Sequence, residues 1–148
     1  MRIEHSSVVA APRERVFAFF DDPANLERIT PPDVSVEMVS APERPAVGES
    51  VVLKIGKGPV RVTWEAIFTV YERGHRFVDE QGKGPFARFR HEHRFEDMPG
   101  GGTRLVDVID YEPPLGPFGW VADRLFVARE LRKMLAYRHA RTHELLES

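Results

Sequence analysis

Two histidines, His91 and His93, alternate with charged residues in the segment 88–96. If the segment is a β-strand, both imidazoles share one face with Phe89 and Phe95, because successive strand residues point to opposite sides. An unpartnered buried polar group costs on the order of 1–3 kcal/mol. The two imidazoles on this apolar face therefore need hydrogen-bond partners or a wet space inside the protein.

The following segment, 103–112, offers a partner across a hairpin turn at 99–102. In a register where paired residue numbers sum to about 200, His93 lies opposite Asp107, with Cβ atoms roughly 4.5–5.5 Å apart. Asp107 then accepts a hydrogen bond from His93 and fixes its tautomer. The same register pairs Phe95 with Leu105, His91 with Ile109, and Phe89 with Tyr111.

Three roles for the histidines are open. The first, which we expect, is a structural hydrogen bond or a polar lining of a pocket. The second is acid–base catalysis by His93 with Asp107, with Tyr111 as a further candidate. The third is a metal site, which needs a third ligand beside the two imidazoles. Candidates for that ligand are His5, His75 and Asp107. We expect no metal and no cofactor.

The elements that position these residues follow from turn signals and periodicity. Residues 2–10 predict a strand, and Pro12 predicts the start of a short helix. Asp22 is a plausible N-cap of a second short helix with Pro23 as its first residue. Six strand segments follow, of which 60–70 has the clearest alternation. One face of this segment carries Val60, Val62, Trp64, Ala66, Phe68 and Val70.

A helix is predicted from about 119 to 146, because no breaker interrupts an apolar stripe with helical spacing. Its first half is the more apolar, so we expect its start to be the buried end. The fold class predicted is α+β: a curved, seven-stranded antiparallel sheet with two short helices between the first two strands. The long C-terminal helix covers the concave face, and residues 1–148 form a single domain.

Composition excludes several classes of function. The net charge of -2 argues against a nucleic-acid partner. The chain has no cysteine, which excludes disulfides and thiolate chemistry. It has no signal-peptide pattern and no apolar run that inserts stably in a membrane. We therefore expect a cytoplasmic protein.

Four segments resemble one family: LERITPP at 26–32, FVDEQGKGPFARFRHEHRFE at 77–96, TRLVDVIDYEPPLGPFGW at 103–120 and LRKMLAYRHAR at 131–141. They are similar to the START and birch-pollen-allergen superfamily (SRPBCC), in its polyketide cyclase/dehydrase-like branch. The resemblance covers nearly the whole chain. It implies a helix-grip fold with a cavity between the sheet and the long helix that receives a small hydrophobic molecule.

We expect this protein to bind or transport a lipid, polyketide or isoprenoid-like molecule. The alternatives are a cyclase or dehydratase with a His–Asp pair in the cavity, and an interaction module, such as a homodimer. Gln81 and Tyr111 either orient the ligand or cap strand ends. The expected ligand-binding residues are Trp64, Phe68, Phe77, Gln81, Phe89, His91, His93, Phe95, Asp107, Ile109, Tyr111, Leu125, Leu131 and Leu135.

Overall fold

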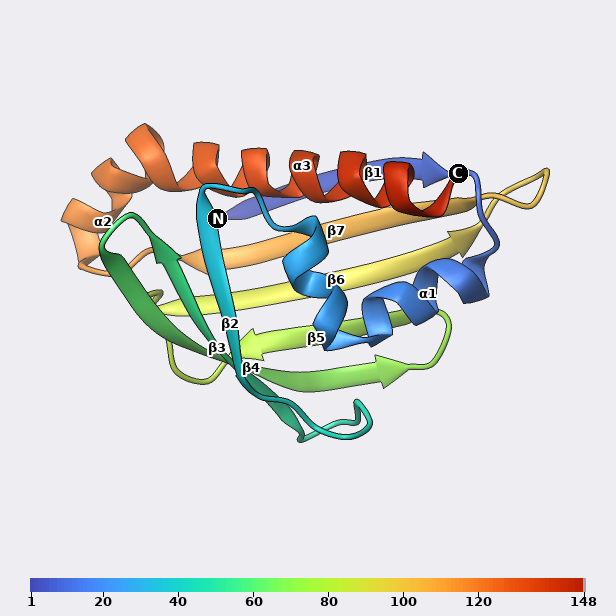
Figure 1. Cartoon of the computed structure of the whole chain (residues 1–148). Helices are drawn as coiled ribbons and strands as arrows, with labels where there is room; N and C mark the ends of the chain where they lie inside the picture. The colour runs from blue at the N-terminus through green and yellow to red at the C-terminus, as the bar shows by residue number, and fades with distance from the viewer. Residues whose placement is uncertain (148) are drawn as a thin grey trace.

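A strongly curved sheet and a long C-terminal helix dominate the fold (Figure 1). The computed structural model describes residues 1–147, apart from the side chain of Arg124. The elements are β1 (Arg2–Val9), α1 (Arg13–Asp21), the 3₁₀ helix η1 (Pro23–Ile29), β2 (Val34–Ser40), β3 (Ser50–Lys57), β4 (Val60–Glu72), β5 (Arg76–Gln81), β6 (Arg88–Asp97), β7 (Thr103–Glu112), α2 (Gly116–Ala122), the π-helical turn η2 (Asp123–Val127) and α3 (Ala128–Leu146).

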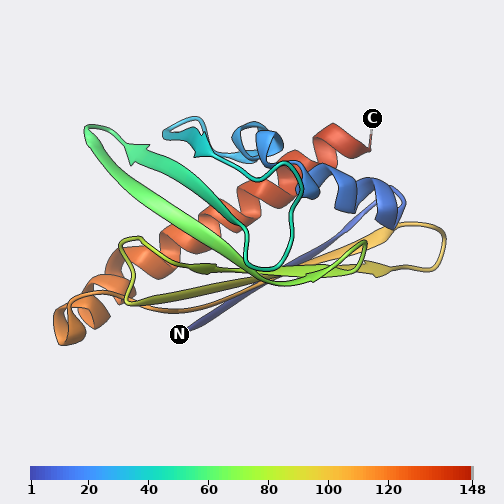
Figure 2. The same ribbon diagram turned by 90° about the horizontal axis from the view of Figure 1, so that it is seen from below.

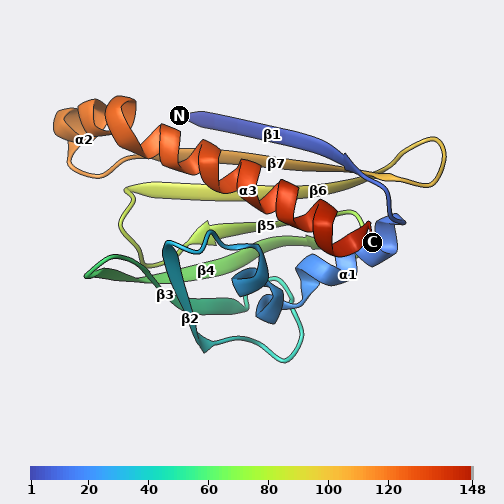
Figure 3. The same ribbon diagram turned by 45° about the horizontal axis from the view of Figure 1, so that its top comes forward.

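The strands form a single seven-stranded antiparallel sheet in the order β1-β7-β6-β5-β4-β3-β2 across the described residues. Strands β2 to β7 follow one another as a meander, and β1 pairs with β7 at the far edge. Figures 2 and 3 show α3 crossing the concave side of the sheet, with α1 and η1 beside its C-terminal end. This arrangement confirms the predicted helix-grip fold.

The pairing of β6 with β7 has the predicted register. His93 lies opposite Asp107, and the other three predicted pairs are also found. Phe89, His91, His93 and Phe95 are all buried. Their alternation with charged residues therefore identified the inner face of β6 correctly.

Asp22 and Pro23 start η1 as predicted. The carboxylate of Asp22 accepts a hydrogen bond from the backbone N–H of Ala24 at 3.0 Å. Pro23 occupies the first turn, where its missing N–H leaves no intrahelical bond unmade. The cap directs η1 over the cavity side of the sheet, where Leu26 and Ile29 pack.

The alternation predicted for 60–70 is wrong at its end. A β-bulge between Phe68 and Val70 shifts the register of β4 against β5. A bulge places an extra residue on one strand and so reverses the side of the residues beyond it. Tyr71, rather than Val70, packs into the core, and its hydroxyl donates to Asp21 at 2.6 Å.

The predicted burial of the long helix is also wrong. Its apolar first part is exposed, and the buried side chains lie in the second half, at Leu135, His139, Thr142 and Leu146. Figure 1 shows α2 beyond the end of the sheet, where no strand lies beneath it. The π-turn η2 adds a residue to one turn and rotates the early stripe away from the later one. No helix in the range 1–147 has an apolar stretch long enough to cross a bilayer.

Two clusters of buried side chains form the core at opposite ends of the concave face. The larger contains Phe17, Phe77 and Phe95, whose rings pack edge-to-face or stacked. The smaller contains Phe89 and Leu135 with three further buried side chains, Ile3, Ile109 and Tyr111. Trp64 packs against both clusters and so lies between them.

Truncating Phe95 tests the larger cluster. Its ring is 2% exposed, so Phe95→Ala is expected to lower the free energy of unfolding by about 3–5 kcal/mol, through lost burial and a residual cavity. Urea denaturation measures the change. Phe126→Ala is the matched control, because Phe126 is 66% exposed and its loss is expected to change stability little. Equal effects of the two substitutions would contradict this packing.

Candidate functional site

A cavity of about 590 Å³ lies between the concave face of the sheet and the helices η1 and α3. Its walls are largely apolar. From η1 and β2 to β4 they include Leu26, Ile29, Val36, Leu53, Ile55, Val62, Trp64, Ala66 and Phe68. Helix α3 contributes Leu131, Met134 and Tyr137. The volume lies within the ordinary range of small-molecule sites, roughly 300–1,000 Å³.

Eight of the residues predicted to bind a ligand line this cavity. They are Trp64, Phe68, Phe77, Phe89, His91, His93, Asp107 and Leu131. The aromatic and aliphatic members come from the inner faces of neighbouring elements. The three polar members come from β6 and β7 and lie together. The sheet thus gives the cavity an apolar body and one polar end.

The other six predicted residues are not among the described residues that form the cavity wall. Phe95, Ile109, Tyr111 and Leu135 are buried inside the two core clusters, so other side chains separate them from the space. Leu125 is 60% exposed, because η2 lies beyond the sheet. Gln81 bonds both N–H and C=O of Phe86, and therefore closes the β5–β6 loop instead of facing a ligand.

The hydroxyl of Tyr111 is also bonded to another side chain and does not face the cavity. Its hydroxyl donates to the buried carboxylate of Asp123 at 2.5 Å, and this bond ties β7 to the start of the C-terminal helices. Burial, together with the Asp123 carboxylate, raises the pKa of the Tyr111 phenol. Tyr111 is therefore a structural tether and not an acid–base group of the cavity.

Asp107 is the centre of the polar end. Its Oδ1 accepts from Nε2 of His91 at 2.6 Å and lies 3.1 Å from Nδ1 of His93. Its Oδ2 accepts from Nε2 of His139, on α3, at 2.6 Å. The predicted His93–Asp107 contact is present, but it is one of three. A single buried carboxylate thus joins β6, β7 and the long helix.

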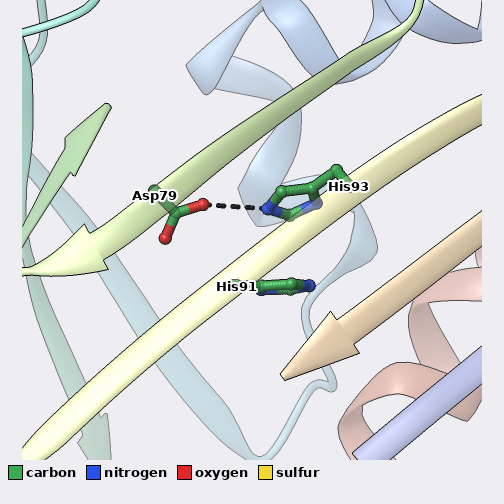
Figure 4. A group of neighbouring side chains, drawn as sticks. All are labelled: Asp79, His91 and His93. Carbon is green, nitrogen blue, oxygen red and sulfur yellow. Dashed lines mark hydrogen bonds and ion pairs between the residues drawn. The ribbon is translucent and has the colours of Figure 1, made fainter. Parts of the chain in front are cut away.

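Asp79 is a second carboxylate at this end. It lies on β5 opposite His91, and its Oδ2 accepts from Nε2 of His93 at 2.9 Å (Figure 4). Both ring nitrogens of His93 are therefore bonded to carboxylates. His91, in contrast, uses only Nε2, and no hydrogen bond of its Nδ1 is found within residues 1–147.

The network continues from His139 towards the protein surface. Nδ1 of His139 lies 2.6 Å from the hydroxyl of Ser7 on β1, which lies 3.1 Å from Nε2 of His143. Nδ1 of His143 is 3.0 Å from Glu147. These bonds fix α3 along β1 and hold His139 in place against Asp107.

The pKa values of the two cavity histidines are shifted in opposite directions. Burial lowers the pKa of His93, but bonds to Asp107 and Asp79 outweigh it and raise the pKa to about 9. Burial and the neighbouring charge of His93 lower the pKa of His91. At neutral pH, His93 is therefore a cation between two carboxylates, while His91 is neutral.

Both carboxylates stay ionised for a related reason. Burial raises the pKa of Asp107, but the three imidazole bonds, that of His139 foremost, hold it well below the ordinary value. For Asp79, the bond from His93 outweighs burial and lowers the pKa. Arg138 supplies a further cation on the cavity wall. Its Nε is buried and has no partner among the described residues.

A metal ion is the other species that this end of the cavity suits. Asp79, His91 and His93 each offer one ligand atom, and the three atoms lie within 4.8 Å of one another. Asp79 thus takes the place of the third ligand predicted from sequence. Of the candidates from sequence, His5 packs against His139 and His75 contacts Arg13, while Asp107 bonds the other nitrogens of the two rings.

Sequence reasoning missed Asp79, His139 and Arg138. Asp79 belongs to the same inner face as Phe77, two residues earlier, so the alternation of β5 carried a usable signal. His139 and Arg138 lie in a helical segment whose polarity suggested exposure. His139 is buried against Asp107, a carboxylate from a distant strand, and Arg138 is half-buried on the cavity wall. Helical periodicity alone reveals neither position.

The fold and site define a START-like, helix-grip class of protein. An aromatase/cyclase, Zhui, from Streptomyces sp. R1128 matches with a TM-score of 0.79 and 18% identity, covering 99% of this chain and 93% of that one. A START superfamily protein from Mycobacterium smegmatis matches with a TM-score of 0.73 and 15% identity, covering 99% and 97%. At these identities the likeness shows the fold alone.

The sequence itself identifies the family. The chain belongs to the family described as polyketide cyclase/dehydrase and lipid transport, whose pattern matches residues 1–141. No curated protein matches the sequence. A nucleoside-diphosphate sugar epimerase from Corynebacterium glutamicum contains a similar domain, with 25% identity and a TM-score of 0.73. The match covers 98% of this chain but only 29% of that larger one.

Removing the charge of Asp107 tests its central position. Asp107→Asn keeps the shape but turns an acceptor of three bonds into a group that also donates, and it leaves the His93 cation with less compensation. We expect the free energy of unfolding to fall by about 3 kcal/mol, as for a broken buried ion pair. Asp110→Asn, on the same strand, is the control and is expected to change stability little. Equal losses of unfolding free energy in both variants would show that the hydrogen bonds around Asp107 do not specially stabilise the fold.

The raised pKa of His93 predicts a loss of stability at alkaline pH. The folded pKa of about 9 lies above the unfolded value of 6.5, so the contribution is complete below pH 6.5 and disappears as pH rises through 9. Over that window we expect a loss of about 3 kcal/mol. Denaturant unfolding in EDTA-containing buffers measures it. His93→Gln should remove this slope and His75→Gln should retain it; a wild-type profile without the slope would contradict the assignment.

Proposed function

We propose that the protein binds a small, mostly apolar molecule whose one polar group lies against His91 at the polar end of the cavity. The observation that carries this proposal is the composition of the cavity wall. Aliphatic and aromatic side chains cover most of it, and the polar residues that β5, β6 and β7 contribute, Asp79, His91, His93 and Asp107, lie together in one hydrogen-bonded group. The other polar residues of the wall come from the helices, the segments beside them and Lys57. Such a surface favours a ligand with an apolar body and one oriented polar end.

Hydrophobic burial supplies the affinity in this proposal. Transfer of apolar area from water contributes roughly 25 cal/mol per Å², so a ligand that fills much of the cavity gains several kcal/mol before the entropy of association is subtracted. Trp64, Leu53 and Phe68 offer few hydrogen-bond partners to water in the cavity. Displacement of that water by an apolar molecule is therefore favourable.

The polar end supplies orientation. Because His93 is held between two carboxylates, it has no free nitrogen for a ligand. His91 lines the cavity and has its Nδ1 available, while its Nε2 is fixed by Asp107. A ligand hydroxyl can donate to that nitrogen. The guanidinium of Arg138, on the same wall, suits a carbonyl or carboxylate oxygen nearby.

The opening of the cavity carries charges that link its two sides. Lys57, at the end of β3, lies 3.1 Å from Glu130 of α3 and 3.5 Å from Asp33, and all three line the cavity. Exposed ion pairs of this kind are weak, at about 0–1 kcal/mol. They therefore allow the β3–β4 hairpin to separate from the helix and admit a ligand at little energetic cost.

Filling the cavity tests the proposal. Ala66 lines the apolar wall on β4, and Ala66→Phe is expected to abolish the binding of a fluorescent apolar probe such as anilinonaphthalene sulfonate while the protein stays folded. Thr63→Phe is the matched control, because Thr63 lies on the opposite, exposed face of the strand and adds the same ring outside the cavity. Fluorescence titration gives both affinities, and circular dichroism checks folding.

Native mass spectrometry of the purified protein adds an independent check. We expect a bound species of small mass, extractable by organic solvent, in the wild type and in Thr63→Phe but not in Ala66→Phe. Equal probe binding by the two variants would refute a ligand site in this cavity.

A second candidate is an enzyme of the cyclase or dehydratase kind. The description of the family and the likeness to an aromatase/cyclase favour it, as does a neutral imidazole facing the cavity. In this case His91, rather than the predicted His93, exchanges a proton with the bound molecule, because only His91 has a free nitrogen.

Substitution of His91 separates this candidate from simple binding. Incubation with poly-β-ketone model substrates, followed by mass spectrometry, detects cyclised or dehydrated products. An enzyme requires that His91→Gln lose at least about 100-fold in turnover, the usual contribution of an acid–base group, while probe affinity stays within a few-fold. Unchanged product formation in that variant would exclude His91 as the acid–base group.

A further inference from the structure

We propose that Asp79, His91 and His93 form a binding site for a divalent transition-metal ion such as Zn²⁺ or Co²⁺ at the polar end of the cavity. This inference goes beyond the proposed binding of a small molecule and does not depend on it. It also departs from the sequence-based expectation that the protein has no metal.

The geometry of the three side chains supports the site. Figure 4 shows Asp79, from β5, on one side of the two imidazoles of β6. One ligand atom of each residue lies within 4.8 Å of the other two. The rings of His91 and His93 are stacked, with centroids 3.7 Å apart and planes 26° apart, because residues two positions apart point the same way from a strand. Two nitrogens and one carboxylate oxygen thus lie close enough together for a turn of the stacked rings to bring all three onto one ion.

Asp107 orients the two rings from the opposite side. It bonds Nε2 of His91 and Nδ1 of His93. Nδ1 of His91 is then free for the ion, and Nε2 of His93 becomes a ligand when the ion displaces the proton that this nitrogen now donates to Asp79. Histidines that bind metals usually donate their other N–H to a carboxylate in this way, which fixes the tautomer and strengthens the ligand nitrogen. His139 in turn holds Asp107 at 2.6 Å. An outer layer of hydrogen bonds is therefore already in place.

The charge around the site and its position on the cavity wall also favour a divalent transition-metal ion. Two carboxylates lie close to the site, Asp79 as a ligand and Asp107 bonded to the other nitrogens of the two rings, and together they offset most of the charge of a divalent cation and of the nearby Arg138. Two imidazoles and one carboxylate are a ligand set that suits Zn²⁺, Co²⁺ and Fe²⁺. All three ligand residues line the cavity, so further coordination positions are open to water or to an oxygen of a bound molecule.

Binding requires the three ligand atoms to move closer together and the two stacked rings to turn towards the ion. Metal–nitrogen distances of about 2.0–2.1 Å bring ligand atoms closer together than their present spread. Asp79 can supply this movement, because its side chain is 18% exposed and its one hydrogen bond, to His93, is replaced by the ion. The histidines stay anchored by Asp107.

The test uses untagged, full-length protein, stripped with EDTA and then titrated with Co²⁺ and with Zn²⁺. Calorimetry is expected to show one ion per chain, and Co²⁺ is expected to give a visible absorption band of nitrogen and oxygen coordination. Asp79→Asn and His91→Gln are each expected to weaken binding by at least about tenfold. His143→Gln is the matched control, since this histidine lies at the outer end of the network and should leave the affinity unchanged.

Several results would overturn the proposal. These are no saturable binding of either ion by the wild type, or equal affinity in the wild type and in Asp79→Asn and His91→Gln. If either variant fails to fold, paramagnetic shifts of the His91 and His93 resonances in Co²⁺-loaded wild type decide the question; unshifted resonances overturn the site. Apolar-probe binding in EDTA, measured on the same preparation, is expected to persist, so a failure here leaves the proposed function intact.

Discussion

The hydrogen bonds to the buried carboxylate of Asp107 hold the functional end of this protein together. An ionised carboxylate inside an apolar fold is costly unless its oxygens are fully bonded. Here three imidazoles share that role, two from β6 and one from α3. The same bonds thereby fix the long helix to the sheet, set the tautomer of His91, and keep His93 charged.

The cavity follows from this attachment and from the curvature of the sheet. Helix α3 is held close to β1 and β7 by His139 and its neighbours, while β2, β3 and β4 curve away on the other side (Figure 3). The space that opens between them is too wide for the side chains of Val62, Ala66 and Leu53 to fill. Short apolar side chains on strongly curved strands therefore produce a space, where larger ones would produce a core.

Local sequence patterns were sufficient for most of the fold. Alternation in β6 and the hairpin turn after it predicted the inner face and the register, and so placed His93 opposite Asp107 from the order of residues alone. The cap formed by Asp22 and Pro23 was equally local. The bulge in β4 and the π-turn η2 were not predictable in the same way, because each depends on neighbouring elements and leaves little trace in hydrophobic periodicity.

The site was predicted only in part, for a related physical reason. Residues on the inner face of a strand can be identified by alternation, which found His91, His93 and Asp107. Whether such a residue faces a cavity or a packed cluster depends on what lies above it. Phe95 on β6 and Leu135 on α3 both point inward but lie beneath other side chains of the core clusters. His139 is buried because its imidazole bonds to Asp107. These contacts join segments that are far apart in the sequence, so local periodicity does not reveal them.

The proposed function requires an apolar space that ends at a neutral imidazole, held by Asp107 and free to bond a ligand. A high-resolution crystal structure of the protein as purified shows whether that space is occupied. We expect electron density for a small organic molecule between α3 and β4, with a polar atom within hydrogen-bond distance of Nδ1 of His91. A helix packed closely onto β4, with the space closed and that nitrogen bonded to another protein group, would contradict it.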